Sequence, residues 1–354
     1  MRENVYLLKS IPGEDDAAYA SRLWEALEKL DAFRFVEDRD IVAVKTHFGE
    51  TRKSGYIRPP YLRAVGDCIK VKGGVPFLTE TSTLYKGRRN NAISHLALVS
   101  DHGFGYEHTG MPAIMADGLM GDEEIEVEIP GKIHRRVKIA SLLAKVQALV
   151  VMSHFTGHLG AGFGAALKNT GMGLASRRGK LAQHSTARPS INKKACTRCG
   201  MCVRWCPEDA ISMNDESAVI NSKKCVGCGQ CLAVCRFDAV KYNWGATYED
   251  LQKNVVEHAW GAHLCVLGKS LYINFLTRIS KDCDCMTVYE QIAPDIGVLI
   301  SGDPVAVDAA SLDLVERHAG KRLPALAYDI PYRHQIDYAR ELGFGNPDYA
   351  IVEI

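Results

Sequence analysis

Short apolar segments alternate with amphipathic segments along most of the chain. Before residue 190, this pattern predicts strands at 5–9, 41–45, 75–79 and 148–152, and helices at 17–30, 61–71 and 91–100. In the first of these helices, Leu23, Ala26, Leu27 and Leu30 recur on one face. Residues 125–129 and 136–139 are predicted to form a hairpin. Strands that alternate with helices indicate a mostly parallel sheet with helices on both faces.

The alternation returns after residue 243. The pattern predicts a helix at 248–265 and strands at 271–275 and 297–300. Asp303 and Pro304 are expected as N-cap and first residue of a further helix that extends to about residue 318. The fold class is therefore α/β, with mostly parallel sheets expected in two lobes.

Composition and charge are those of an ordinary globular protein. Of the 354 residues 47% are hydrophobic, and 43 basic side chains against 42 acidic ones give a net charge of +1. This balance does not favour a nucleic-acid or anionic-membrane partner. The sequence has no apolar stretch of membrane-spanning length and no signal peptide, so we expect a cytoplasmic protein that is not bound to a membrane.

Cysteine is concentrated in one short segment. Eight of the twelve cysteines lie between Cys196 and Cys235, and without an export signal this density favours metal ligation over disulfides. They form two C-x2-C-x2-C-x3-C runs; Pro207 follows the first, and Arg236 stands in the same place after the second. Each run repeats the ligand pattern of bacterial two-cluster ferredoxins.

Residues 191–242 thus resemble the bacterial two-cluster ferredoxin family and are predicted to form an insert between the host parts 1–190 and 243–354. Two 4Fe–4S clusters are the expected cofactors, and the fourth cysteine of each run is expected to cross to the other cluster. The expected ligands are Cys196, Cys199, Cys202 and Cys235 for cluster A, and Cys225, Cys228, Cys231 and Cys206 for cluster B. Two zinc sites would also use eight thiolates and are the alternative. No low-complexity linker flanks the insert, so it should dock against the host.

A glycine-rich segment follows the strand predicted at 148–152. Gly160, Gly162 and Gly164 precede a predicted helix that carries Lys168. Glycines let a ligand approach the backbone, and the free N–H groups of a helix start attract anions, so these four residues are predicted to bind an anionic group. A dinucleotide site is rejected because 161–207 lacks the acidic residue that would hold the ribose.

The same window contains nine basic residues and no acidic ones. They are Lys168, Arg177, Arg178, Lys180, Arg188, Lys193, Lys194, Arg198 and Arg204. Three interpretations are open. The residues could form a solvated face that balances negative clusters, a pocket for a phosphate- or carboxylate-bearing ligand, or a charged surface for a partner protein.

Several motifs outside the insert carry a family resemblance. They are Lys45-Thr46-His47-Phe48, the stretch from His154 to Gly173, Cys283-Asp284-Cys285, Pro294-Asp295-Ile296-Gly297 and Ser301-x-Asp303-Pro304-Val305-Ala306-Val307-Asp308. With them the chain resembles the domain-of-unknown-function 362 family of iron–sulfur proteins over nearly its whole length. A ferredoxin is a known kind of insert in that family, and the resemblance implies no established reaction.

A short stretch carries a second resemblance. His158, Lys168 and His184 fall at spacings similar to those of the nickel-pincer lactate racemase family. In that family, a histidine acts as acid and base, a lysine ten positions later tethers the pincer nucleotide, and a further histidine ligates nickel. The resemblance implies that the three residues share one site, and it leaves open an additional metal or phosphate-bearing cofactor.

Cys283 and Cys285 form a short C-x-C. They are either two thiols without a ligand role or a pair that chelates one soft metal ion. A redox disulfide is less expected, because a bridge across one residue is strained.

These features predict an iron–sulfur oxidoreductase. Electrons would pass from a redox partner protein through the two clusters to a small anionic ligand in the host, where His158, Lys168 and His184 are the predicted catalytic residues. One alternative is a non-catalytic ferredoxin-type electron carrier, which should lack a closed polar pocket. Another is a racemase- or isomerase-like enzyme with a metal or nucleotide cofactor.

Overall fold

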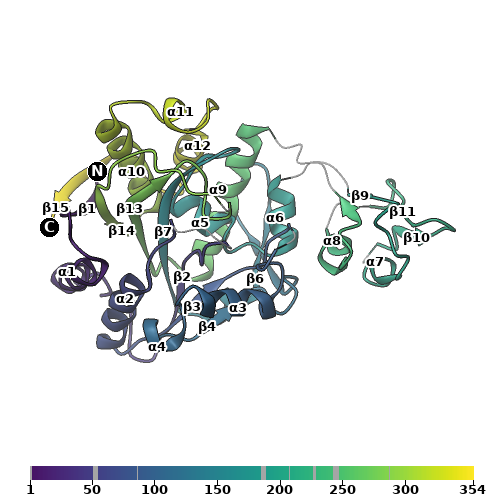
Figure 1. Cartoon of the computed structure of the whole chain (residues 1–354), viewed down its shortest axis with the longest axis horizontal. Coiled ribbons are helices and arrows are strands. Elements are labelled where there is room, and N and C mark those ends of the chain that lie inside the picture. Colours follow the sequence, from purple (N-terminus) through teal and green to yellow (C-terminus); the bar gives the residue numbers. More distant parts are fainter. Residues whose placement is uncertain are drawn as a thin grey trace.

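A computed structural model describes residues 2–50, 55–85, 87–184, 189–206, 208–225, 229–241, 247–286 and 288–354. Its largest feature is a nine-stranded sheet with the order β15-β1-β14-β13-β7-β2-β3-β4, in which β8 also pairs with β7 (Figure 1). The strands of this sheet are β1 (Glu3–Lys9), β2 (Ile41–Lys45), β3 (Val75–Glu80), β4 (Ala113–Met115), β7 (Ala148–His158), β8 (Gly162–Gly164), β13 (Ser270–Ser280), β14 (Gly297–Ser301) and β15 (Tyr349–Glu353).

The strands β13, β7, β2, β3 and β4 are parallel to one another, and β14 is antiparallel to both of its neighbours. The expected α/β fold with a mostly parallel sheet is confirmed. The two host parts, however, share this one sheet and do not each form their own. They are joined because β7 pairs with β13 and β1 pairs with β14 and β15.

Strand β7 separates two apolar cores. Its side chains alternate, so Leu149 and Val151 belong to one core and Val150 and Met152 to the other. A strand that is covered on both faces has no polar side, which explains the uninterrupted apolar run at 148–152 in its first half.

Helices cover both faces of the sheet. Those of the host are α1 (Asp16–Lys29), α2 (Pro59–Val71), α3 (Ala92–Asp101), α4 (Tyr106–Thr109), α5 (Ala166–Gly171), α6 (Arg177–His184), α9 (Tyr248–Cys265), α10 (Pro304–Ala319), α11 (Leu323–Leu326) and α12 (His334–Leu342), with a 3₁₀ turn at Ser141–Lys145. As predicted, Asp303 is the N-cap of α10 and accepts hydrogen bonds from the N–H groups of Val305 and Ala306 at 2.7 and 3.0 Å. The predicted hairpin is formed by β5 (Glu124–Glu128) and β6 (Arg136–Ala140). Among the described helices, none combines the length and apolar character needed to cross a membrane.

The cysteine-rich segment forms short elements to one side of the large sheet (Figure 1). They are β9 (Ser190–Ile191), α7 (Met201–Arg204), β10 (Ile211–Met213), β11 (Ala218–Ile220), α8 (Gln230–Val234) and β12 (Val240–Lys241). The segment repeats itself: Asn192 donates its N–H to Ala239 O at 2.7 Å, and 29 positions later Asn221 donates to Ala210 O, also at 2.7 Å. The two halves therefore exchange equivalent contacts.

The host contributes apolar side chains to the core of this segment. Leu84, which follows β3, and Leu181 of α6 belong to one apolar cluster with Cys231 and Leu232 of α8. Gly229 lies so close that a Cβ atom there would be 2.3 Å from Leu181 Cδ2. The insert is thus packed against the same side of the host that carries α6.

Candidate active site and cluster sites

A cavity of about 590 Å³ opens where three parallel strands end. Lys45, Glu80 and His158 are the last residues of β2, β3 and β7, and all three line it. The carboxyl ends of neighbouring parallel strands are the usual place for ligands in α/β sheets. The other lining residues are His47, Thr81, Thr83, Leu84, Tyr85, Arg89, Leu159, Gly160, Lys168, Asn169, Met172, Gly173, Lys180, His184, Thr247, Tyr248, Leu251, Cys285 and Met286.

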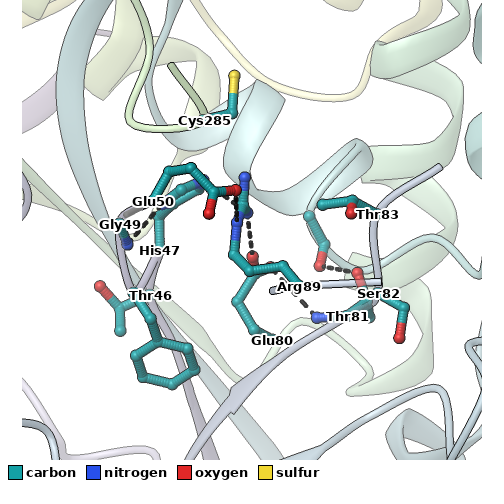
Figure 2. A network of polar contacts seen from close by, with 12 residues as sticks. Thr46, His47, Gly49, Glu50, Glu80, Thr81, Ser82, Thr83, Arg89 and Cys285 are labelled. Atoms are coloured by element: carbon teal, nitrogen blue, oxygen red, sulfur yellow. Dashed lines mark hydrogen bonds and ion pairs between the residues drawn. The ribbon is translucent and has the colours of Figure 1, made fainter. Parts of the chain in front are cut away.

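The floor of the cavity is a buried network of charges. Lys45 is fully buried, and its Nζ lies 2.7 Å from Glu80 Oε1 and 2.7 Å from Asn169 Oδ1. Arg89 extends between Glu80 and Glu50, with N–O distances of 3.4 and 3.2 Å, as Figure 2 shows. Burial acts to raise the pKa of Glu80, but Lys45 and Arg89 outweigh it and hold that pKa below its usual value. Each buried charge in the network therefore has an opposite charge beside it.

His47 is held neutral by the same network. Gly49 donates its N–H to His47 Nδ1 at 2.9 Å, and Arg89 NH1 lies 2.9 Å from His47 Nε2. Both ring nitrogens thus face donors, so the doubly protonated ring would be repelled. Burial, followed by the charges of Arg89 and Lys45, accordingly keeps the pKa of His47 well below its ordinary value.

Lys168 lies on α5 and points into the cavity. Its ammonium group has no hydrogen-bond or ion-pair partner among the residues that the structure describes. Burial and the nearby charges of Lys45 and Arg89 lower the pKa of Lys168 to about 8. At neutral pH it is therefore a cation without a matching anion.

His158 is oriented by the turn that follows β7. The N–H groups of Gly160 and Ala161 donate to His158 Nδ1 at 3.1 and 2.9 Å, so the neutral ring carries its proton on Nε2. Burial, Lys168 and His184 hold the pKa of His158 well below its usual value. His158 can thus donate one hydrogen bond into the cavity from a neutral ring.

The structure brings His158, Lys168 and His184 together around this cavity. Burial, then Lys168 and Lys180, lowers the pKa of His184 to about 3, so this ring is also neutral. Within the described ranges, no three His, Cys, Asp or Glu side chains are grouped so as to hold a single metal ion. The placement of His158, Lys168 and His184 around one cavity fits the expectation that they share a site. Their catalytic roles stay predictions.

The predicted anion-binding helix start was wrong. The N–H groups of Ala166 and Leu167, which begin α5, donate to the two carboxylate oxygens of Asp308 at 2.8 and 2.9 Å. Asn274 Nδ2 lies 2.8 Å from Asp308 Oδ1 as well. A buried side chain of α10 thus uses the amides that were expected to face a ligand. Asp308 instead fixes the position of the helix that carries Lys168.

The glycine-rich segment is a hairpin and not an open loop. Strand β7 continues to His158, and β8 returns antiparallel to it, with Gly162 paired with His158 and Gly164 with Thr156. Of the three predicted glycines, Gly160 lines the cavity. Gly162 has a positive φ of 77°, and a Cβ there would be 2.6 Å from Tyr332 Cα. Its need for glycine therefore comes from packing against Tyr332.

The basic window divides into separate groups. Lys168 and Lys180 line the cavity, and the Nζ of Lys180 also donates to Thr81 and to Ala175 O. Arg178 forms an ion pair with Glu124 at 2.9 Å, and Lys193 forms one with Glu216 at 2.7 Å. Two of these residues therefore line the cavity, while others are paired in the host and on the insert, and whether the cavity binds an anionic ligand stays a prediction. Arg188 lies outside the described residues.

The structure joins Cys283 and Cys285 by a disulfide, which was less expected from the sequence than either two free thiols or a metal-chelating pair. Cys285 lines the cavity, as Arg89 does, and Figure 2 draws both side chains. Between the cysteines, buried Asp284 lies 2.9 Å from His154 Nδ1. His154 Nε2 faces the carbonyl oxygens of Thr277 and Arg278 at 3.0 and 3.1 Å. Both ring nitrogens face only acceptors, which fits a protonated His154 paired with Asp284.

The four cysteines assigned to cluster A surround one small cavity. Cys196, Cys199, Cys202 and Cys235 all line it, together with Gly200 and Phe237. Ala218 N–H lies 3.4 Å from Cys196 Sγ, and Ala239 N–H lies 3.4 Å from Cys235 Sγ. Amide donors to cysteine sulfur are among the features that tune iron–sulfur clusters, so this set of donors fits a cluster.

Of the cysteines assigned to cluster B, Cys206, Cys225 and Cys231 lie within the described residues. Ala210 N–H lies 3.3 Å from Cys206 Sγ, the counterpart of the Ala239–Cys235 contact. Cys231 is buried beside Leu84 and Leu181, whereas Cys199 is exposed. Cys228 lies outside the described residues, as does Pro207. Cys231 of the second run therefore faces the host, whereas Cys199 of the first run faces solvent.

Several functional candidates were missed by local sequence patterns. Glu80 and Arg89 were not singled out, Lys45 and His47 were noted for the family resemblance alone, and Lys180 was counted in the basic window. A usable signal was present, because Lys45 and Glu80 are charged residues that end two otherwise apolar strands. Such residues gather at one edge of a parallel sheet.

The sequence matches the family described as domain of unknown function (DUF362) over residues 42–313. The chain belongs to the DUF362 family. The resemblance noted in the sequence is thereby confirmed. No curated protein matches this DUF362 chain in sequence.

Three solved structures are similar to this DUF362 protein in whole or in part. The lactate racemase apoprotein from Thermoanaerobacterium thermosaccharolyticum is 13% identical with a TM-score of 0.42, and the match covers 77% of this chain and 50% of the racemase. A protein from Thermotoga maritima is 11% identical with a TM-score of 0.45, covering 87% of this chain and 60% of that one. The ferredoxin from Thauera aromatica is 37% identical with a TM-score of 0.15, covering 19% of this chain and 92% of the ferredoxin. The chain thus spans about half the length of the racemase that it matches.

Proposed function

We propose that this protein is an iron–sulfur oxidoreductase that passes electrons from two 4Fe–4S clusters to an anionic small molecule in the host cavity. The proposal rests on the contact between the insert and the host. Leu84 lines the cavity and also packs in one apolar cluster with Cys231 and Leu232. An electron on cluster B would therefore lie next to the cavity wall.

The residues of the cavity support a role in reduction, which consumes protons as well as electrons. When bound, the clusters would supply single electrons. Lys168 would hold the anionic group of the substrate and, with a pKa of about 8, could also release a proton at neutral pH. His158 would donate a hydrogen bond from Nε2, since the amides of Gly160 and Ala161 occupy Nδ1. A plain electron carrier would have no use for such a cavity.

The redox partner is proposed to be an acidic protein that docks over cluster A. Cys199 is exposed there, and the exposed side chains of Lys194, Arg198 and Arg236 lie close to its ligands in sequence. Phe237, which is 46% exposed, lines the same small cavity. Arg198→Glu should slow reduction by anionic dithionite at low salt and speed reduction by the methyl viologen radical cation. Unchanged rates with both reductants would contradict the docking site.

Anaerobic purification with metal analysis tests the cluster assignment. Eight iron and eight acid-labile sulfide per chain are expected, with visible absorption that is bleached on reduction. Stoichiometric zinc without labile sulfide would show that the alternative metal site is the correct one.

A second experiment tests whether the clusters serve the cavity. The reduced protein would be mixed anaerobically with a panel of small carboxylate and phosphate-ester acceptors, and reoxidation of the clusters would be followed by absorption. Lys168→Met should slow reoxidation by the effective acceptor at least tenfold, while Lys9→Met, on the exposed part of β1, should not. Equal rates in both variants would favour the carrier alternative.

A further inference from the structure

The unpaired charge of the cavity limits the kind of anion that it can hold. Among the described side chains of the cavity and the network around it, Lys45, Arg89, Lys168 and Lys180 are cationic. Glu50, Glu80 and Asp117 are anionic; Asp117 contacts Ser82 N at 2.7 Å and interacts electrostatically with Lys180. Three cations are thus matched by three carboxylates. The excess is one positive charge, and Lys168 carries it because it has no partner there.

The remaining ionisable groups do not change this balance. His47, His158 and His184 are neutral, as their low pKa values and hydrogen-bond partners indicate. Asp284, which also acts on Lys168, is matched by His154. A ligand with one negative charge would therefore neutralise the cavity, and a ligand with two would leave one charge buried without a partner.

Another part of the cavity wall is apolar. Leu84, Leu159, Met172, Tyr248, Leu251 and Met286 line it. Leu159, Tyr248 and Met286 expose 52%, 47% and 42% of their surface, so this wall is open to water. Large exposed apolar side chains around a cavity mark a ligand surface, because a ligand that covers them removes apolar area from water.

The polar and apolar parts adjoin each other. A Cβ at Gly160 would lie 3.0 Å from Leu251 Cδ2 and 3.7 Å from His158 Cε1, which places the donor ring and the apolar wall on either side of one glycine. A volume of about 590 Å³ leaves room for a ligand larger than a bare anion.

We infer that the cavity binds a monocarboxylate with an apolar body. Its carboxylate would accept hydrogen bonds from the Lys168 ammonium and from His158 Nε2–H. Its apolar body would cover Leu251 and the exposed side chains of Leu159 and Tyr248. This inference rests on the proposed function, since it names the class of anion for the same cavity.

Calorimetric titration of the anaerobically purified protein, with its clusters in place, tests the inference. Four probes separate charge from apolar body: phenylacetate has both in the proposed form, 2-phenylethanol lacks the charge, acetate lacks the body, and phenyl phosphate carries a second charge. Phenylacetate should bind at least tenfold more tightly than each of the others. Equal or tighter binding of phenyl phosphate would overturn the inference, as would the absence of phenylacetate binding.

Two variants test which side chain of the cavity binds the carboxylate and which binds the apolar body. Lys168→Met should weaken phenylacetate binding at least tenfold and leave 2-phenylethanol unchanged, with Lys9→Met as the matched control. Leu251→Ala should weaken the binding of phenylacetate and of 2-phenylethanol and leave that of acetate unchanged. Phenylacetate affinity that survives Lys168→Met would overturn the inference.

The readouts keep this inference apart from the proposed function. Iron content and cluster reduction report on the electron-transfer proposal, and neither depends on a bound carboxylate. A protein that keeps reducible clusters but binds none of the probes would refute the ligand class alone. A protein without clusters that still binds phenylacetate would refute the oxidoreductase and leave the ligand class standing.

Discussion

The host and the cysteine-rich insert are stabilised in different ways. The host has a nine-stranded sheet with an apolar core on each face. The insert has strands of two or three residues and a small buried cluster of apolar side chains, to which the host contributes Leu84 and Leu181. A segment with so little apolar burial depends on added cross-links or metal for its stability. The host buries far more apolar surface in its two cores.

This difference also separates the two kinds of site. The cysteines of the insert lie close together in sequence, and the proposed clusters would both occupy the sites and hold the fold. The host cavity is built by an already stable sheet, so its charged floor is held in place whether or not a ligand is bound. We therefore expect the fold of the insert to be lost or kept as a unit when its cluster sites are changed. Substitutions in the cavity should have only local effects.

Removal of the clusters should have the largest effect. After oxidation and chelation of iron, backbone amides of 189–206 and 229–241 should lose their protection from hydrogen exchange almost completely. Amides of β7 and β13 should keep theirs, because two apolar cores hold those strands. Hydrogen exchange with mass spectrometry measures both regions in one sample. An insert that stays protected without iron would show that its small core suffices.

The close contact between α5 and α9 should be a sensitive point of the host. At Gly171 a Cβ atom would be 2.0 Å from Val255 O, so Gly171→Ala should force the two helices apart. We expect a loss of about 1–3 kcal/mol of unfolding free energy, typical of overpacking. Lys168 would be displaced as well, but iron content should not change. Gly302→Ala is the control, since no atom lies within 4 Å of its Cβ position.

A smaller effect is expected from pH on ligand affinity. Burial, Lys45 and Arg89 lower the pKa of Lys168 to about 8, against the raising effect of Asp284 and Glu80. The ammonium form binds the carboxylate, so affinity should be constant near pH 6–7 and fall about tenfold per pH unit above 8. His158 and His184 are neutral throughout this range.

The titration of Lys180 must be distinguished from that of Lys168 in this experiment. Burial also lowers the pKa of Lys180 to about 8, and Lys180 lines the same cavity. Titration of phenylacetate into Lys168→Met at each pH makes the distinction. Loss of the pH dependence assigns it to Lys168, and an unchanged profile would assign it to Lys180.

Local patterns determined much of this protein. The bounds predicted for β2 at 41–45 and α9 at 248–265 agree with the structure, because strand and helix periodicities are local properties of the chain. The spacing of the cysteines is likewise a local property, and it predicted the ligand pattern of a two-cluster ferredoxin. The resemblance to the lactate racemase family implied that His158, Lys168 and His184 share one site, and all three line one cavity.

The tertiary structure decided how the rest of the site is built. Lys45, Glu80 and Arg89 meet because β2 and β3 are neighbours, and nothing near Lys45 in sequence reveals its contact with Asn169. Asp308 accepts hydrogen bonds from the amides at the start of α5, although it lies 142 positions after Ala166 in the sequence. A local pattern shows that a helix start has free donors, but only the packing of distant elements determines whether a ligand or a buried carboxylate accepts from them. For that reason the sequence indicated a segment that lines the cavity, but the fold commits the amides of Ala166 and Leu167 to Asp308 and leaves Lys168 as the candidate to bind an anion.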